Sequence, residues 1–205
     1  MELINRNSIS NCLIYLAGIF ILILQSSCTP YKQNERIIIA GAGKITSVDP
    51  AQANTFHALQ LISALGDPLY RLSKGGELVP KLALQKPIIK NNGLSILIPL
   101  RKDVIFHDGT PFNAEAMAFS IKRFKRIGTM NYILDERIRT AEAIKPYLLE
   151  IQLNRPSVSI KRLLSSINLT PISPIGYSNH SEKFLNKKFV GTGPYILTNF
   201  TPHQQ

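Results

Sequence analysis

Hydrophobic positions along the chain follow two spacings, one typical of helices and one typical of strands. Residues 55–65 contain no Gly or Pro, and apolar side chains recur there at every third position. This spacing predicts an amphipathic helix that ends at the breaker of residues 66–68. A second helix is expected to begin after Asn113, a residue type that caps helices, and to run to about Arg126. Its expected buried face consists of Met117, Ala118, Ile121 and Phe124.

Short apolar runs alternate with these helices. Residues 148–153 alternate apolar and polar side chains, the pattern of a half-buried strand. The pair Asp108-Gly109 predicts a tight turn. The other expected elements are strands at 36–40, 94–100, 104–106 and 195–197, a short helix within 158–167, and an extended crossing marked by Pro171 and Pro174. Strands that alternate with single helices indicate an α/β or α+β fold with mixed sheets.

The first thirty residues differ from the rest. Residues 12–24 carry no charge and would span about 20 Å as a helix, short of the roughly 30 Å core of a bilayer. We therefore expect residues 1–27 to be a secretory signal peptide rather than a membrane span. Small residues precede Cys28, as a lipoprotein signal peptidase requires, so Cys28 is the expected lipid attachment site. Gln25 stands where such signals usually have Leu, and an uncleaved N-terminal anchor helix is the alternative.

Composition and charge exclude several classes of protein and of binding partner. Hydrophobic residues make up 44% of the chain, which excludes a disordered protein, and two cysteines exclude a disulfide scaffold. The net charge of +11 indicates an anionic partner. Four cations lie near the end of the second predicted helix, where they complement its carbonyl groups: Lys122, Arg123, Lys125 and Arg126. We expect a solvated helix end there and no nucleic-acid partner, because no aromatic side chains are interleaved.

Side chains suited to catalysis are not grouped in recognisable patterns. None of the four His pairs with Cys, Asp or Glu at metal-ligand spacing, and no G-x-S-x-G motif is present. His107 and Asp108 fit a turn held by hydrogen bonds better than an acid–base pair. Residues 41–46 (GAGKIT) depart from both nucleotide-binding glycine patterns, so a flexible loop is expected. The residues predict a non-enzymatic chain without metal or cofactor.

Five motifs in a fixed order are informative together. They are SVDPA at 47–51, GELVPKLA at 76–83, LRKDVIFHDGTPFNAE at 100–115, PISP at 171–174 and GTGPY at 191–195. This series resembles the bacterial extracellular solute-binding proteins of family 5, which serve peptide and nickel ABC importers. The resemblance covers about residues 36–197. Two departures are Ala116, where an acidic residue is usual, and the lack of Trp after Ala83.

The resemblance implies a fold similar to type II periplasmic binding proteins, of which this chain would hold the first part and lack most of the second ligand lobe. Residues 28–35 would be a spacer. Residues 36–50 and 168–205 would form part of the first lobe, and residues 51–167 an accessory α/β subdomain of that lobe. A ligand would lie between two lobes that close by a hinge motion.

In the family, the loop after the Asp49-Pro50 turn lines the ligand cleft. By position, the implied solute contacts are Gln52, Asn54, Thr55 and Phe56, although Phe56 equally fits the first core residue of its helix. The implied function is the solute-binding component of an ABC importer, for peptides first and for nickel or other solutes less readily. Its partners would be the solute, permease subunits and, through the lipid or helix anchor, the outer face of the membrane.

Alternatives follow from the chain's length. A truncated or non-functional remnant is one, and a lipid-anchored docking module without solute binding is another. With one cleft wall incomplete, we expect weak or no peptide binding by this chain alone.

Overall fold

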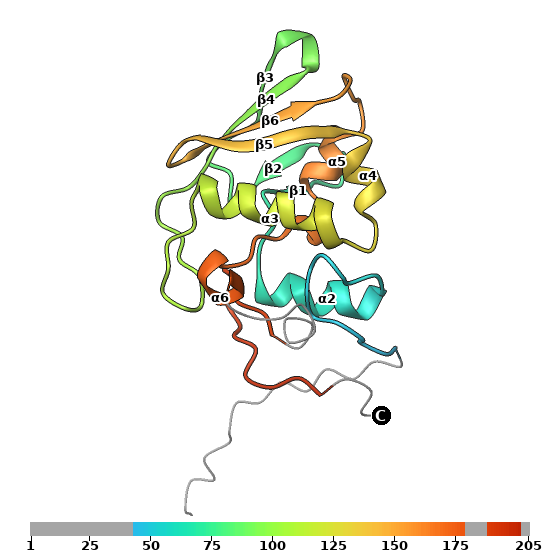
Figure 1. Cartoon of the computed structure of the whole chain (residues 1–205), viewed down its shortest axis with the longest axis vertical. Coiled ribbons are helices and arrows are strands. Elements are labelled where there is room, and N and C mark those ends of the chain that lie inside the picture. Colours follow the sequence, from blue (N-terminus) through green and yellow to red (C-terminus); the bar gives the residue numbers. More distant parts are fainter. Residues whose placement is uncertain (1–42, 179–187, 202–205) are drawn as a thin grey trace, which may run out of the picture. The chain divides into compact units, whose positions relative to one another are not determined.

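The computed structural model describes residues 43–178 and 188–201 (Figure 1). The predicted signal peptide, Cys28, the spacer and the strand at 36–40 lie outside these residues. Within the described ranges, no helix has both the length and the apolar character needed to cross a membrane.

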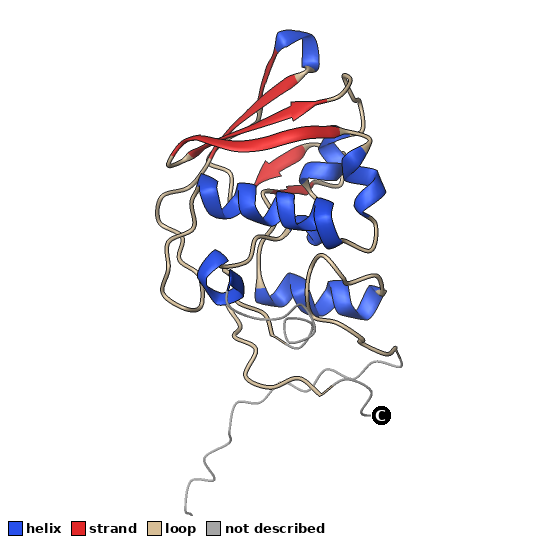
Figure 2. Ribbon diagram, in the orientation of Figure 1, coloured by secondary structure: helices blue, strands red, loops and turns tan. Residues whose placement is uncertain are grey.

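A four-stranded antiparallel sheet forms one layer of the fold, and Figure 2 draws its strands, like those of the smaller sheet, in red. Its strands, in the order β3-β4-β6-β5, are β3 (Ile88–Lys90), β4 (Ser95–Pro99), β6 (Leu148–Leu153) and β5 (Ile138–Lys145). Strand β4 pairs with β6 from Ser95 opposite Gln152 to Pro99 opposite Leu148. Strand β6 buries every second residue, so the predicted alternation is confirmed.

Helix α3 (Ala114–Ile127) packs against strands β5 and β6 and supplies the second layer (Figure 1). It begins where the sequence predicts, because the Asn113 side chain accepts a hydrogen bond from the amide of Ala116 at 2.9 Å. The predicted inner face is confirmed, since Met117, Ala118, Ile121 and Phe124 are all buried. These side chains belong to the same core as Ile98 and Leu149 of the sheet.

Helix α2 (Phe56–Leu65) also matches its prediction and ends at Gly66. A small two-stranded sheet follows, made of β1 (Tyr70–Leu72) and β2 (Leu78–Pro80). The turn between them contains Gly76 with φ of 76°, a left-handed conformation that favours glycine.

The remaining elements are short. They are η2 (Asn91–Gly93), α4 (Asn131–Asp135), α5 (Ile160–Leu164), η3 (Ile167–Leu169) and α6 (Pro174–Ser178). The helix predicted within 158–167 is thus present but shorter. The predicted crossing is extended only up to Ser173, because Pro174 begins a helix. Proline suits that first helical position, where its missing N–H costs no hydrogen bond.

Two predicted strands are wrong. Residues 104–106 form only an isolated bridge, in which Ile105 lies opposite Pro111. The amides of Phe106 and Phe112 donate to the carbonyls of Thr110 and Val104 on either side of this bridge. The ladder stops there because the turn at Gly109 closes it at one end and helix α3 begins after Asn113 at the other. Residues 195–197 lie in a loop, and Tyr195 and Ile196 are exposed. Among the described residues no neighbouring strand is offered to them, and an apolar run without a partner does not become a strand.

Candidate functional site

The loop of residues 49–55, which leads into α2, holds three of the four predicted solute contacts, and the fourth begins the helix. Its backbone folds into a tight turn around Asp49. The amide of Ala51 donates to the Asp49 carboxylate at 3.0 Å, and the amide of Ala53 donates to the Asp49 carbonyl at 2.9 Å. The loop therefore has a defined conformation of its own.

A buried ion pair fixes the start of this loop. The Arg123 guanidinium, from α3, donates to one carboxylate oxygen of Asp49 at 2.8 Å and also to the other, and both side chains are almost fully buried. The ring of Tyr177, from α6, lies 5.2 Å from the guanidinium carbon. Burial raises the pKa of the Tyr177 hydroxyl above its usual range, and the nearby negative charge of Asp49 adds to this effect.

This ion pair corrects the interpretation of the basic cluster on α3. Lys122 and Arg126 are exposed, as expected of a solvated helix end. Arg123 instead lies on the buried face beside Phe124. An unpaired charge at this buried position would be strongly unfavourable. The carboxylate of Asp49 supplies the opposite charge that compensates Arg123.

Two further residues, one through its side chain and one through its backbone, also hold the loop. The Asn168 amide donates to the carbonyl oxygens of Pro50 at 2.9 Å and Ala53 at 2.8 Å. The amide of Thr129 donates to the carbonyl of Ala51 at 2.9 Å. A loop secured at several points keeps the side chains on its other surface in place, which favours binding without loss of conformational entropy.

Two of the predicted contact residues serve the scaffold. The Gln52 amide donates to the carbonyl of Ile127 at 2.5 Å, and its side-chain oxygen accepts from the Thr129 hydroxyl at 3.3 Å. The Thr55 hydroxyl caps α2 by accepting from the amide of Ala58 at 3.3 Å. Both side chains thus have partners within the protein.

The other two, Asn54 and Phe56, point outward. Asn54 is exposed, and Phe56 is 75% exposed, with its ring edge-on to His57 at 5.7 Å between centroids. The possibility that Phe56 packs as the first core residue of its helix is therefore wrong. The structure thus leaves two side chains exposed where this loop meets α2, an amide on Asn54 and an aromatic ring on Phe56.

Three of the sequence motifs contact one another beside α2. We call this contact region the joint; it comprises His107, Asp108, Ser173, Gly191 and Gly193. The amide of His107 donates to the carbonyl of Gly191 at 2.9 Å, and its ring nitrogen Nε2 lies 2.8 Å from the carbonyl oxygen of Gly193. The amide of Gly193 in turn donates to the carbonyl of Leu65 at the end of α2. A Cβ on Gly193 would lie 2.5 Å from that backbone, so the close approach requires glycine.

Asp108 is part of the same joint. Its carboxylate accepts hydrogen bonds from Thr110 and from the hydroxyl of Ser173 in the PISP motif. Partial burial alone would raise the pKa of Asp108, but the hydrogen bonds from Ser173 and Thr110 outweigh it, and the pKa lies below its usual value. The predicted turn is confirmed: Gly109 has φ of 82°, and these contacts support a structural role for His107 and Asp108.

The family is shown by comparison with known proteins. A sequence model of the middle region of the bacterial extracellular solute-binding proteins, family 5, matches residues 77–205. The chain therefore belongs to this family, as its motifs predict. A curated relative is the glutathione-binding protein GsiB of Escherichia coli strain 536, 28% identical over 85% of this chain and 34% of its own length.

Solved structures agree in fold. NikZ from Campylobacter jejuni, in complex with Ni(L-His), is 26% identical over 78% of this chain and 32% of its own, with a TM-score of 0.66. OppA from Listeria monocytogenes, bound to peptide, is 23% identical over 76% of this chain and 34% of its own, with a TM-score of 0.69, a likeness in fold alone. This confirms the expected type II binding-protein fold, and the chain spans about a third of these relatives' length.

The sequence interpretation missed the residues that secure the loop: Asp49, Arg123, Asn168 and Tyr177. One signal was present, because Arg123 lies three residues after Ser120 and seven after Ala116, the spacing of one buried helix face. Among the described residues, no three His, Cys, Asp or Glu side chains come together as a metal site.

Proposed function

We propose that the protein is the solute-binding component of an ABC importer for peptides, and that Asn54 and Phe56 form part of the wall facing the solute. Family membership supports solute binding. The Escherichia coli relative is named for glutathione, and the Listeria OppA structure holds a peptide. The observation that carries the proposal is the exposure of these two side chains, one at the end and one just beyond the end of a loop that Asp49, Arg123 and Asn168 hold in place.

The chemistry of the two side chains suits a peptide. The Asn54 amide both donates and accepts hydrogen bonds, as a peptide group requires. The Phe56 ring offers an apolar surface for a side chain. Binding makes and breaks no covalent bond. In a two-lobed protein, hinge closure would bring a second wall over the solute and present both lobes to the permease.

Export and anchoring are part of the proposal and rest on the sequence. Residues 1–27 would direct export, and Cys28 would carry the lipid that holds the protein at the outer face of the membrane. We also propose that residues 36–50 and 168–205 form part of the first lobe and that residues 51–167 form an accessory α/β subdomain of that lobe. Metabolic labelling with palmitate tests the anchor: the label is expected in the wild-type chain and not in Cys28→Ala, and equal labelling would contradict it.

A titration followed by NMR tests the solute site. Asn54 and Phe56 lie on an exposed surface, so a peptide held by them alone is at most half buried, and we expect millimolar affinity. Di- to pentapeptides should shift amide signals of residues 52–57. The variants Asn54→Ala and Phe56→Ala should abolish these shifts, whereas Gln60→Ala, an exposed change on the same helix, should leave them unchanged.

Three results would contradict the proposal. A micromolar dissociation constant would show that a more enclosed site exists elsewhere. If the peptide shifts the same amide signals in the Asn54→Ala and Phe56→Ala variants as in the wild type, the peptide binds elsewhere. Recovery of permease subunits from membranes, independent of added peptide and without any shift at residues 52–57, would favour the docking module over the solute-binding protein.

A further inference from the structure

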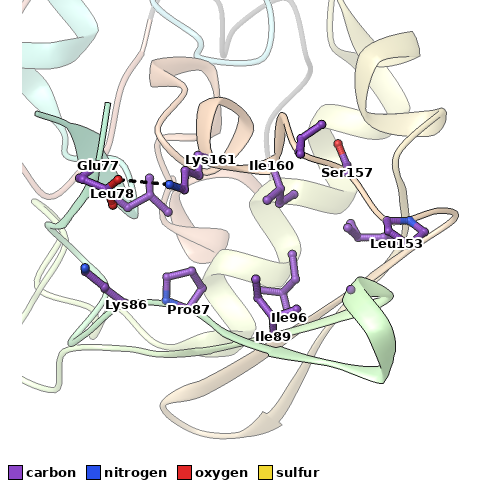
Figure 3. A pocket seen from close by; sticks show the side chains of 13 residues that line it. Glu77, Leu78, Lys86, Pro87, Ile89, Ile96, Leu153, Ser157, Ile160 and Lys161 are labelled. Carbon is purple, nitrogen blue, oxygen red and sulfur yellow. Dashed lines mark hydrogen bonds and ion pairs between the residues drawn. The ribbon is translucent and has the colours of Figure 1, made fainter. Parts of the chain in front are cut away.

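A groove of about 580 Å³ lies between strands β3 and β4 on one side and helix α5 on the other (Figure 3). Its volume falls within the roughly 300–1,000 Å³ of small-molecule sites. None of residues 49–56 lines it, so the proposed solute site does not account for it.

The groove is apolar along most of its length. Its floor is made of buried Ile96, Leu153 and Ile160, and its rim includes Ile89, which is 60% exposed, and Val158, which is fully exposed. Single exposed apolar residues are common, but several that border one hollow mark a place where an apolar group binds.

Charge is confined to one side of the groove. Lys161, from α5, forms an ion pair with Glu77 at 3.5 Å, so its charge is compensated. Lys86 lies on the same side in Figure 3, while Leu153 and Ser157 lie on the opposite side. Within residues 43–178 and 188–201, Lys86 has no hydrogen bond or ion pair. One ammonium group therefore remains available beside an apolar groove.

We propose that this groove binds a free amphipathic carboxylate, a molecule with one unbranched apolar chain and one carboxylate group. The chain lies against Ile89, Ile96 and Ile160, and the carboxylate pairs with Lys86. An apolar groove with a single uncompensated cation at one side complements both parts of such a molecule. This site is additional to the proposed peptide site and stands independently of it.

Calorimetry of the full chain with decanoate and with decanol tests the proposal. Decanoate should bind more tightly than decanol. Lys86→Gln should weaken decanoate binding by about tenfold, the size of one charge-assisted hydrogen bond, and leave decanol binding unchanged. Ile89→Ser should weaken both ligands, because it removes apolar contact that both chains use.

Matched surface variants serve as controls. Ile105 is 64% exposed, close to the value for Ile89, and lies outside the groove. Lys145 is likewise exposed and does not line it. Ile105→Ser and Lys145→Gln should change neither affinity. Because residues 12–24 are also apolar, the decisive quantity is the difference between variants.

Three outcomes would overturn the proposal. The first is equal binding of decanoate by the wild-type and Lys86→Gln chains. The second is binding that is insensitive to Ile89→Ser, which would place the ligand elsewhere, residues 12–24 included. The third is no binding of free decanoate together with Lys86-dependent association with phosphatidylglycerol vesicles, which would make the occupant a membrane surface. Unchanged decanoate binding in Asn54→Ala separates this test from that of the peptide site.

Discussion

Asp49 and Arg123 lie 74 positions apart in the sequence and form a buried ion pair, with two hydrogen bonds between guanidinium and carboxylate. This pair joins the loop that carries Asn54 and leads into Phe56 of α2 to helix α3, which packs on the main sheet. The placement of the candidate solute contacts thus depends on a charge inside the core.

Removing one partner of this ion pair should be severe. Arg123→Ala leaves the Asp49 carboxylate buried and unpaired, so we expect a loss of about 3–5 kcal/mol in the free energy of unfolding. Urea denaturation measures it. Lys122→Ala, at the exposed neighbouring position, should change stability by less than about 0.5 kcal/mol. Similar losses in both variants would contradict the role assigned to the pair.

The N-cap at Thr55 separates a structural role from a solute contact. Thr55→Val keeps the side-chain shape but removes the hydroxyl that accepts from Ala58, so it should cost about 1 kcal/mol of stability. Thr55→Ser retains the cap and should cost much less. If thermal denaturation gives equal values for both variants, the cap does not stabilise α2.

Two adjacent glycines allow a matched test of backbone strain in the β1–β2 turn. Gly76 has φ of 76° and open space where a Cβ would be. Gly76→Ala should therefore lower the free energy of unfolding by about 1 kcal/mol, because Ala is strained at positive φ and no steric clash adds to this. Gly75 has no positive φ, and its Cβ would come no closer than 3.8 Å to Ser73. Gly75→Ala should therefore be neutral or slightly stabilising. Chemical denaturation that ranks the two variants the other way would contradict this conformation.

Asp108 should make the free energy of unfolding depend on pH in the acidic range. Its pKa is lower in the folded protein than in the unfolded chain, so the unfolded state binds more protons and stability rises with pH. The contribution is present above about pH 4, the ordinary range of Asp, and is lost as pH falls further, through the folded-state pKa. Urea midpoints between about pH 2 and pH 7 should vary less in Asp108→Asn than in wild type, with Glu136→Gln as the surface control. Equal pH profiles would contradict the linkage.

Much of the fold was predictable because its signals are local. Helix α3 combines a capping Asn113 with regular apolar spacing, and β6 shows strict alternation, so each element is specified by its own residues. The strand expected at 195–197 failed for the opposite reason. A strand needs a second strand to pair with, and the residues of the segment do not reveal whether such a strand lies beside it.

The candidate site was predictable only in part. Its position followed from the family motif, but the orientation of each side chain depends on distant residues. Gln52 turns toward Ile127, 75 positions away, and Asp49 is matched by Arg123. Contacts of this separation are set by the packing of α3 against the loop, which no local pattern reveals.

The most direct measurement of the central claim is photo-cross-linking from the candidate wall. The photoreactive residue p-benzoylphenylalanine is placed at position 56 in one chain and, as a control, at position 132, where Tyr132 is an aromatic residue of comparable exposure at 59%. A biotinylated tripeptide should cross-link to the position-56 chain, and excess unlabelled peptide should compete. Equal labelling at both positions, or labelling at position 56 that peptide does not displace, would contradict a solute site at this loop.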